Sequence, residues 1–229
     1  MKEELIEYLE SFISPRRIKL FNSNLLNRTR YITVVLEDVY QLHNASAILR
    51  TCDCLGIQDA HIIENHNQYQ INSEITLGAE QWLNIYKYNQ SGNNTQNAIS
   101  HLKKKGYRIV ATSSHANNAN LESFDLTKGK VAFVFGTELS GITARVEELA
   151  DEFVKIPMFG FSESFNISVS AAIILNQISS KLRQSTIDWK ISEDELAEIK
   201  LDWLKKSIKK PELIEKYFLE NIYKVKSGL

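Results

Sequence analysis

Short apolar runs recur along the middle of the chain, and each leads through a polar turn into an amphipathic stretch. Such runs, rich in β-branched and aromatic residues, are typical of buried strands. The stretches between them carry apolar residues at helical spacing, as at Ala45, Ile48, Leu49 and Cys52. This alternation predicts an α/β fold, with a mostly parallel sheet and helices on both of its faces. The predicted strands are Tyr31–Leu36, Ala60–Ile63, Trp82–Tyr88, Arg108–Thr112, Val131–Phe135 and Phe153–Ile156.

Capping residues bound the predicted helices. Asn44 is of a type that caps helix starts, and Gly56 is expected to end the same helix. Gly106 closes another helix, and Ser164 and Asn166 stand at the start of the longest one. The predicted helices are residues 3–12, Asn44–Leu55, Asn94–Lys105, Thr143–Ala150 and Ser164–Arg183.

The pattern divides the chain into a core and two short extensions. Residues 31–185 contain all the predicted strands, whereas residues 1–30 hold a short helix followed by a basic segment. Residues 186–229 are charged and helical, which predicts a small helical appendage. Its apolar stripes are Leu196, Ile199 and Trp203, and then Leu213, Tyr217 and Phe218.

Composition fits a globular protein in a reducing compartment. The chain is 43% hydrophobic and 24% charged, it has no apolar run of transmembrane length, and its acidic start is unlike a signal peptide. Cys52 and Cys54 are its only cysteines, which favours the cytoplasm. On a helix these two thiols point about 200° apart, so a shared metal site is not expected. Both are interpreted as helix packing residues.

Charge is balanced globally but not locally. The formal net charge is −1, which gives no general attraction to nucleic acid. Residues 14–30 nevertheless hold five basic residues and no acid, which makes this segment the candidate for phosphate contacts. These five residues are Arg16, Arg17, Lys19, Arg28 and Arg30. A second run, Lys205, Lys206, Lys209 and Lys210, fits a solvated helix face at least as well.

Three segments combine a strand, a polar turn and a helix start, namely Thr33–Arg50, Val131–Gly141 and residues 153–178. Free N–H groups at a helix start bind small polar cofactors. The glycines of the turn GTELSGIT mimic a P-loop, but Ile142 stands where its lysine belongs, which disfavours nucleotide hydrolysis. Because no G-x-G-x-x-G follows the first strand, a Rossmann methyltransferase or dehydrogenase is also disfavoured.

In this order, the three segments resemble the motifs of the SpoU–TrmH family of RNA ribose 2′-O-methyltransferases, within the SPOUT superfamily. The matching region spans roughly residues 31–180, and Phe165 replaces a usual leucine, apolar for apolar. The residues that carry the likeness are Asn44 and Arg50 in HNASAILRTCDCLG, Glu138 in FGTELSGIT, and Ser164 and Asn166 in IPMFGFSESFNISVSAA.

The resemblance implies a fold, a cofactor and a substrate. It implies a deep C-terminal trefoil knot, a homodimer and S-adenosyl-L-methionine as cofactor. From the residues themselves, neither a metal nor a membrane is expected as a partner. The segments LEDVYQLHNASAILRTCD and LGAEQWL look most like tRNA enzymes that methylate a D-loop guanosine, nucleotide 18. The implied catalytic residues are Arg50, Asn44, Glu138, Ser164 and Asn166. The implied cofactor-binding residues are Thr112, Gly136, Ile156, Met158 and Phe165.

Asn44 and Arg50 are expected on different faces of one helix, because six residues turn a helix by about 240° net. One pocket within one subunit would rarely use both, whereas a symmetric dimer could. Two roles for Arg50 stay open: proton removal from the ribose hydroxyl, as proposed for the family, or a clamp on an RNA phosphate. His43 is the other candidate base. The remaining histidines, His61, His66, His101 and His115, are interpreted as ordinary surface residues.

Two alternative functions stay open. The first is the same chemistry on 23S ribosomal RNA. Many ribosomal members carry a separate N-terminal RNA-binding domain, for which residues 1–30 are too short, and this favours tRNA. The second is a non-catalytic RNA-binding or assembly protein on the same fold. The presence of Arg50, Ser164 and Asn166 disfavours it.

Overall fold

The structure is a computed structural model of the 229-residue chain, and it describes residues 1–90, 92–113, 121–138 and 140–227. The chain forms two compact units. The core unit is Thr29–Trp189, and the helical unit combines Met1–Arg28 with Lys190–Leu229. The predicted core, residues 31–185, falls within the core unit.

The core unit is built on a six-stranded sheet with the strand order β3-β2-β1-β5-β4-β6. Every pairing between these strands is parallel. Val34 at the centre of β1 pairs with Ala60 of β2 on one side and with Phe133 of β5 on the other. The strands are β1 Ile32–Glu37, β2 Asp59–Ile63, β3 Asn84–Tyr88, β4 Arg108–Thr112, β5 Val131–Phe135 and β6 Glu152–Val154. The predicted parallel sheet is therefore confirmed.

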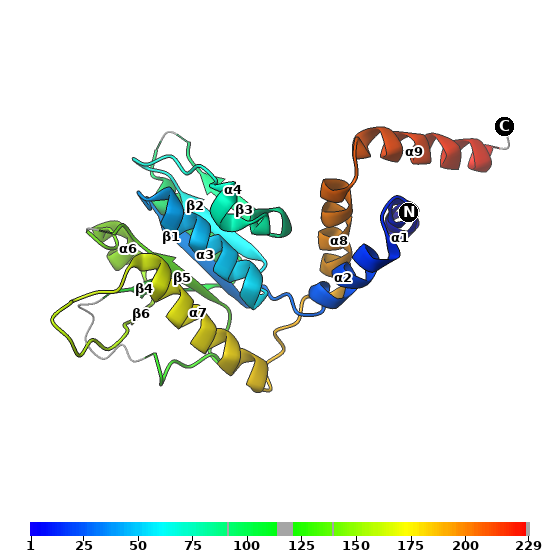
Figure 1. Ribbon diagram of the computed structural model, residues 1–229. Coiled ribbons are helices and arrows are strands. Elements are labelled where there is room, and N and C mark those ends of the chain that lie inside the picture. Colours follow the sequence, from blue (N-terminus) through cyan, green and yellow to red (C-terminus); the bar gives the residue numbers. More distant parts are fainter. Residues whose placement is uncertain (91, 114–120, 139, 228–229) are drawn as a thin grey trace. The chain divides into compact units, whose positions relative to one another are not determined.

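Helices cover both faces of this sheet, as predicted (Figure 1). On one face α3 Leu42–Leu55 and α7 Ile167–Gln184 lie side by side over β1 and β5. On the other face α5 Asn94–Lys104 and α6 Ala144–Leu149 pack against alternate residues of β4 and β5. Each residue of β5 is fully buried because the strand is central and covered twice, which explains its unbroken apolar sequence.

Some boundaries differ from the sequence prediction. Trp82 belongs to a short 3-10 turn, η1 Ala79–Trp82, so β3 begins only at Asn84. The strand β6 ends at Val154, two residues before the predicted end at Ile156. Within the predicted polar loop 64–76, a single helical turn forms as α4 Ser73–Thr76.

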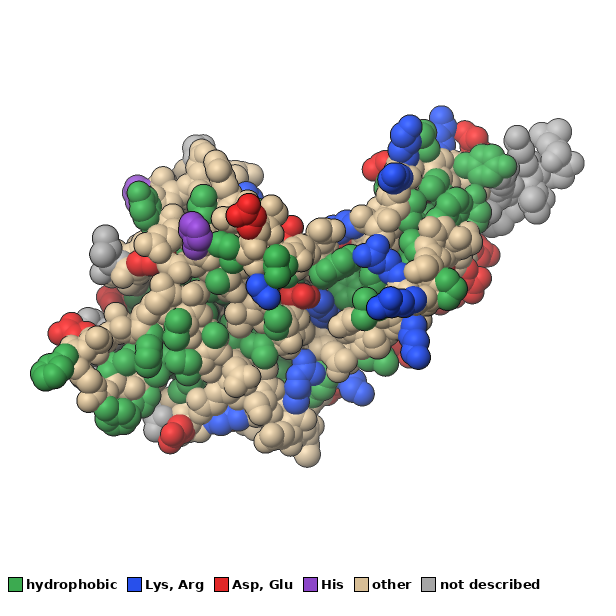
Figure 2. All heavy atoms as spheres, in the orientation of Figure 1, with side chains coloured by type: hydrophobic (Ala, Val, Ile, Leu, Met, Phe, Trp, Pro, Cys, Tyr) green, Lys and Arg blue, Asp and Glu red, His purple; other side chains and the backbone are tan. Residues whose placement is uncertain are grey.

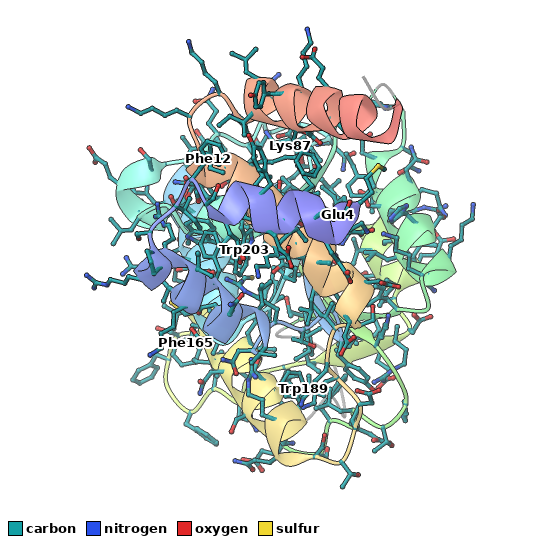
Figure 3. All side chains as sticks on the ribbon, turned by 90° about the vertical axis from the view of Figure 1, so that its right-hand side faces the viewer. Glu4, Phe12, Lys87, Phe165, Trp189 and Trp203 are labelled. Atoms are coloured by element: carbon teal, nitrogen blue, oxygen red, sulfur yellow. The ribbon has the colours of Figure 1, made fainter. Side chains whose placement is uncertain are left out.

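The helical unit contains α1 Lys2–Glu10, α2 Pro15–Leu25, α8 Glu193–Ser207 and α9 Pro211–Ser227. Sequence reasoning missed α2, although Ser14 and Pro15 form a typical start, in which the Ser14 hydroxyl accepts from the N–H of Arg17. Trp203 of α8, labelled in Figure 3, is buried, with the ring of Phe21 5.4 Å from its own. The predicted apolar stripe of α8 is thus confirmed at Ile199 and Trp203.

The two cysteines differ in environment. Cys52 is fully buried in the core, as predicted, whereas Cys54 is exposed, so its interpretation as a packing residue was wrong. The two positions lie on different sides of α3, and only one side faces the sheet. Among the described residues, none of the helices has the length and apolarity needed to cross a membrane.

Candidate active site

A cavity of about 330 Å³ opens at the carboxyl ends of β4, β5 and β6. Ligands of open parallel sheets bind at this edge, where the strand order reverses. Three loops line the cavity: the one after β4, the turn 136–142 after β5, and the segment 155–166 between β6 and α7. A cavity of this size fits a small-molecule cofactor.

Most of the predicted site residues meet in this cavity. The five predicted cofactor-binding residues, Thr112, Gly136, Ile156, Met158 and Phe165, all line it. Of the predicted catalytic residues, Glu138, Ser164 and Asn166 also line it. Asn44 and Arg50, both from α3, are outside its lining.

The turn after β5 is closed by a very tight approach at Gly136. A Cβ atom placed on this glycine would lie 2.1 Å from the carbonyl oxygen of Gly141. The approach is held by two backbone hydrogen bonds, from the N–H of Thr137 to Gly141 (2.8 Å) and back (3.1 Å). Only glycine fits here, because any side chain would clash with the backbone of Gly141 and Ile142. Since Gly136 has no side chain, its backbone lines the cavity directly.

Glu138 is the centre of a hydrogen-bond network that joins the three motif segments. Its carboxylate accepts from the N–H groups of Tyr40 (3.2 Å) and Gln41 (3.1 Å) and from Nδ2 of Asn44 (2.8 Å). Asn166 donates in turn to Oδ1 of Asn44 (3.1 Å). Asn44 therefore connects the turn after β5 to the start of α7, although it is not in the cavity wall.

The Glu138 carboxylate is stabilised in its charged form. Partial burial tends to raise its pKa, but the hydrogen bonds from Asn44, from its own N–H and from Gln41 and Tyr40 outweigh burial and hold the pKa below 4.5. A carboxylate held by several N–H donors behaves in this way. At neutral pH one residue of the cavity lining thus carries a negative charge.

We expect Glu138→Gln to lower the free energy of unfolding by about 1–3 kcal/mol at pH 7, because an amide NH₂ would then meet N–H donors. Since folding lowers the pKa of Glu138, its contribution is complete above the ordinary value of 4.5 and is lost as the pH falls through the lower folded value. Urea unfolding at pH 7 and at a series of pH values below 4.5 should show the gap between wild type and variant narrowing as the pH falls. An equal gap at all these pH values would contradict this network.

The helix α3 begins earlier than predicted. Gln41 is its N-cap and the helix starts at Leu42, so the prediction of Asn44 as the N-cap was wrong. Asn44 lies in the first turn, where it is 5% exposed and its side chain donates a hydrogen bond to Glu138. At the other end Gly56, in the left-handed conformation with φ 74°, ends the helix as predicted.

Arg50 lies two turns along α3 and is exposed. Its Nη1 is 3.4 Å from the carbonyl oxygen of Ile75. The contrast between buried Asn44 and exposed Arg50 agrees with the expectation that they face different ways. Within one chain, Arg50 is therefore not brought to the cavity.

The helix α7 starts at Ile167 instead of Ser164. Asn166 is its N-cap, with Oδ1 accepting from the N–H of Ser168 at 2.8 Å, so the capping prediction is confirmed for Asn166 and wrong for Ser164. Ser164 belongs to the preceding loop, where it lines the cavity.

The basic residues of segment 14–30 fall into two groups. Arg16, Arg17 and Lys19 are exposed on α2. Arg28 is 4% exposed, with its guanidinium 5.0 Å from the Trp203 ring, and Arg30 pairs with Asp59 at 3.2 Å. Arg28 packs against an aromatic ring and Arg30 is in an ion pair, so Arg16, Arg17 and Lys19 are the more accessible of the five predicted phosphate contacts.

The second basic run is partly paired within the helical unit. Lys205 pairs with Glu215 at 2.7 Å and Lys206 with Asp202 at 2.6 Å. Ion pairs of this kind on a helix surface agree with a solvated helix face.

The histidines are not uniformly surface residues. His43 is exposed and remains the only base candidate next to Asn44. His61 is buried in β2 with Nδ1 3.0 Å from the hydroxyl of Tyr88, and burial first, then nearby positive charge, lowers its pKa to about 3. Its interpretation as a surface residue was wrong, and His115 lies outside the described residues.

Sequence reasoning also missed a buried carboxylate beneath the site. Glu37, at the end of β1, is fully buried, and its Oε1 accepts from the hydroxyls of Thr95 (2.7 Å) and Thr143 (2.9 Å). It thereby ties the start of α6, and so the end of the glycine turn, to the sheet. The adjacent acids Glu37 and Asp38, which directly follow an apolar run, were the available signal.

No metal centre is evident, since the described residues contain no group of three His, Cys, Asp or Glu side chains placed to hold an ion.

A parallel α/β core with a cofactor-sized cavity at the carboxyl ends of its strands is typical of an enzyme that binds a small-molecule cofactor. More specifically, the sequence profile of the SpoU rRNA Methylase family matches residues 31–176, and the chain belongs to this family. The resemblance seen in the sequence is thus confirmed.

Two known relatives are similar to this chain over most of its length. A tRNA (guanosine(18)-2′-O)-methyltransferase from Borreliella burgdorferi is 42% identical over 210 residues, which cover 92% of this chain and 94% of the relative. The crystal structure of a TrmH/SpoU tRNA modifying enzyme from A. aeolicus has a TM-score of 0.74 and 30% identity, covering 85% of this chain and 98% of that one.

A more distant structure shares the fold. The SpoU methyltransferase AviRb from Streptomyces viridochromogenes, solved in complex with the cofactor AdoMet, has a TM-score of 0.60 at 20% identity. The match covers 71% of this chain and 65% of that protein.

Proposed function

We propose that this protein transfers a methyl group from S-adenosyl-L-methionine to the ribose 2′-hydroxyl of a tRNA guanosine, nucleotide 18 of the D-loop. The observation that carries the proposal is the convergence of residues from the second and third motifs on one cavity. The name of the 42% identical relative supports the choice of substrate.

The cavity fits the cofactor in size and chemistry. Gly136 keeps the backbone of the turn open to it, and Thr112, Ile156 and Met158 provide its polar and apolar walls. The charged Glu138 suits a ligand that carries positive sulfonium and amino groups. When bound, S-adenosyl-L-methionine supplies an activated methyl group.

The protein's own residues position the acceptor. Glu138, Asn44 and Asn166 form a rigid bridge between loops, so the cavity wall is organised before RNA arrives. The ribose hydroxyl is a weak nucleophile until its proton is removed or its pKa is lowered. Arg50 is the residue proposed to do this, as a base or as a cation that clamps the adjoining phosphate.

In the proposed function, Arg50 of one subunit serves the cavity of the other subunit of a homodimer. It is exposed on α3, outside the cavity lining, whereas a second copy can bring its own Arg50 to the cavity mouth. Exposed apolar side chains near α3 and α7, namely Leu77, Phe165 and Val169, support an interface on this layer. The C-terminal trefoil knot and a cytoplasmic location with tRNA as partner belong to the same proposal.

Labelled cofactor, offered with separate pools of tRNA and ribosomal RNA, tests the proposal. Label should enter tRNA alone and map to a ribose 2′-oxygen in the D-loop. Label in 23S RNA would favour the ribosomal alternative. Binding to RNA without any transfer would favour the non-catalytic alternative.

We expect Arg16→Ala, Arg17→Ala and Lys19→Ala together to weaken tRNA binding and to flatten its salt dependence. Each phosphate contact contributes a log–log slope of about −0.7 to −0.9, so losing three contacts should change the slope by roughly 2 units. Binding is measured by titration at several salt concentrations, with cofactor affinity as a control.

A matched control removes the same charge elsewhere on the helical unit. Lys205→Ala, Lys206→Ala and Lys209→Ala should leave the slope unchanged, because two of these lysines are in ion pairs. A slope that flattens only in this control would place the RNA contact on the C-terminal run.

A further inference from the structure

The loop between β6 and α7 carries two fully exposed aromatic side chains. Phe159 is 98% exposed and Phe161 is 108% exposed, more than any other large hydrophobic side chain of the described residues. Figure 2 shows hydrophobic side chains standing out from this end of the core unit, where Figure 1 draws the loop before α7. Neither ring is part of the lining of the cofactor cavity or of the smaller cavity described next. Rings left in water in this way indicate a surface that a ligand covers.

The loop lines a second cavity of about 430 Å³ as well as part of the cofactor cavity. Lys155, Ile156 and Met158 line both cavities, and Gly160 and Ser162 line the second one. Residues that face the second cavity thus alternate with rings that face solvent. Residues on both sides of the rings, among them Met158 and Ser164, line the cofactor cavity, so the rings belong to a segment that borders it.

We propose that Phe159 and Phe161 are positioning residues that stack on nucleobases of the RNA beside the reacting ribose. This inference rests on the proposed function. A ribose hydroxyl reacts only when it lies about 3–3.5 Å from the methyl group, so the neighbouring nucleotides must cross the rim of the cavity. Bases of loop regions are unstacked and are held on aromatic side chains.

The sequence of the loop favours RNA over a second copy of the chain as the occupant. Phe159 and Phe161 are separated by Gly160 and followed by Ser162 and Glu163, so the two rings have small, polar and charged residues as their neighbours along the loop. A subunit interface would bury a continuous patch with few charges. Exposed aromatic rings among small and polar residues, in the same segment as the cavity-lining Lys155, are typical of single-stranded nucleic-acid sites.

Two paired variants separate stacking from simple apolar burial. Phe159→Leu with Phe161→Leu keeps apolar side chains and removes the rings. Phe159→Tyr with Phe161→Tyr keeps the rings. Using an unmodified tRNA transcript, the Leu pair should raise KM for tRNA by about tenfold or more, and the Tyr pair should stay within about threefold of wild type. Cofactor affinity, unfolding temperature and sedimentation should be unchanged in both pairs.

Several results would overturn the inference. A Leu pair with wild-type KM would show that the rings do not hold RNA. A Leu pair that becomes monomeric would show that they serve the subunit interface. If the wild-type protein transfers no methyl group to tRNA, the proposed function fails separately. Gel-shift binding of the same transcript then still tests the rings, and equal binding by the Leu and Tyr pairs would overturn their assignment.

Discussion

Arg50→Ala is expected to reduce methyl transfer to tRNA by about two to four orders of magnitude, the range for loss of a general acid or base. Affinity for the cofactor should stay within about twofold, because Arg50 is outside the cavity lining. The fold should also persist, since the side chain is exposed and its contact with Ile75 is a long one of 3.4 Å. Single-turnover transfer, cofactor titration and thermal unfolding measure the three effects. Near-normal transfer would remove Arg50 from the mechanism.

Arg50→Lys distinguishes the two roles left open for this residue. A lysine keeps the positive charge but loses the planar fork that binds two phosphate oxygens at once. If Arg50 is a bidentate clamp, the lysine variant should be nearly as inactive as the alanine variant. If a point charge near the hydroxyl suffices, the lysine variant should recover a large part of the activity.

Mixed dimers test whether Arg50 acts across subunits. Arg50→Ala subunits would be mixed in equal amounts with Gly136→Ala subunits, which lack a working cofactor cavity. Random pairing makes about half of the dimers mixed, and each mixed dimer has one intact composite site, so about a quarter of wild-type activity should return. Action within one chain predicts no gain over the two separate variants.

The sheet could be predicted because its strands are buried on both faces. Such strands need unbroken apolar runs, and β4 and β5 were placed to the residue for this reason. Ends of elements were harder, because they depend on tertiary contacts. Asn44 is of a residue type that often caps helices. Its side chain instead lies within the first turn and donates to the carboxylate of Glu138, 94 residues away in the sequence.

The residues of the site also differ in how far the sequence could predict them. Residues that act through local backbone geometry, such as Gly136, were placed by their motif and do meet in one cavity. The burial of Arg28, Glu37 and His61 was missed, because burial of a polar side chain depends on partners that are remote in sequence. For Arg28 the nearby aromatic ring is Trp203, in the other chain segment of the helical unit.

Gly136→Ala should abolish detectable cofactor binding, lowering affinity by roughly 100-fold or more, because the added methyl group closes the tightest point of the site. Its Cβ would lie 2.1 Å from the Gly141 oxygen and 2.4 Å from the Ile142 nitrogen. Both are backbone atoms, so no side chain can turn away to make room. The turn must open and lose the paired hydrogen bonds between Thr137 and Gly141, which shape the cavity wall.

Gly160→Ala is the matched control for this substitution. It makes the same chemical change in the neighbouring loop, where an added Cβ would meet nothing within 4 Å, and cofactor affinity should not change. Calorimetric titration with S-adenosyl-L-methionine measures binding, and thermal unfolding separates a local defect from a global one. The unfolding midpoint of Gly136→Ala should fall by an amount that corresponds to about 1–3 kcal/mol, with the fold retained. Wild-type cofactor affinity in Gly136→Ala would mean that the cofactor binds elsewhere, since this turn cannot accept a methyl group and keep its shape.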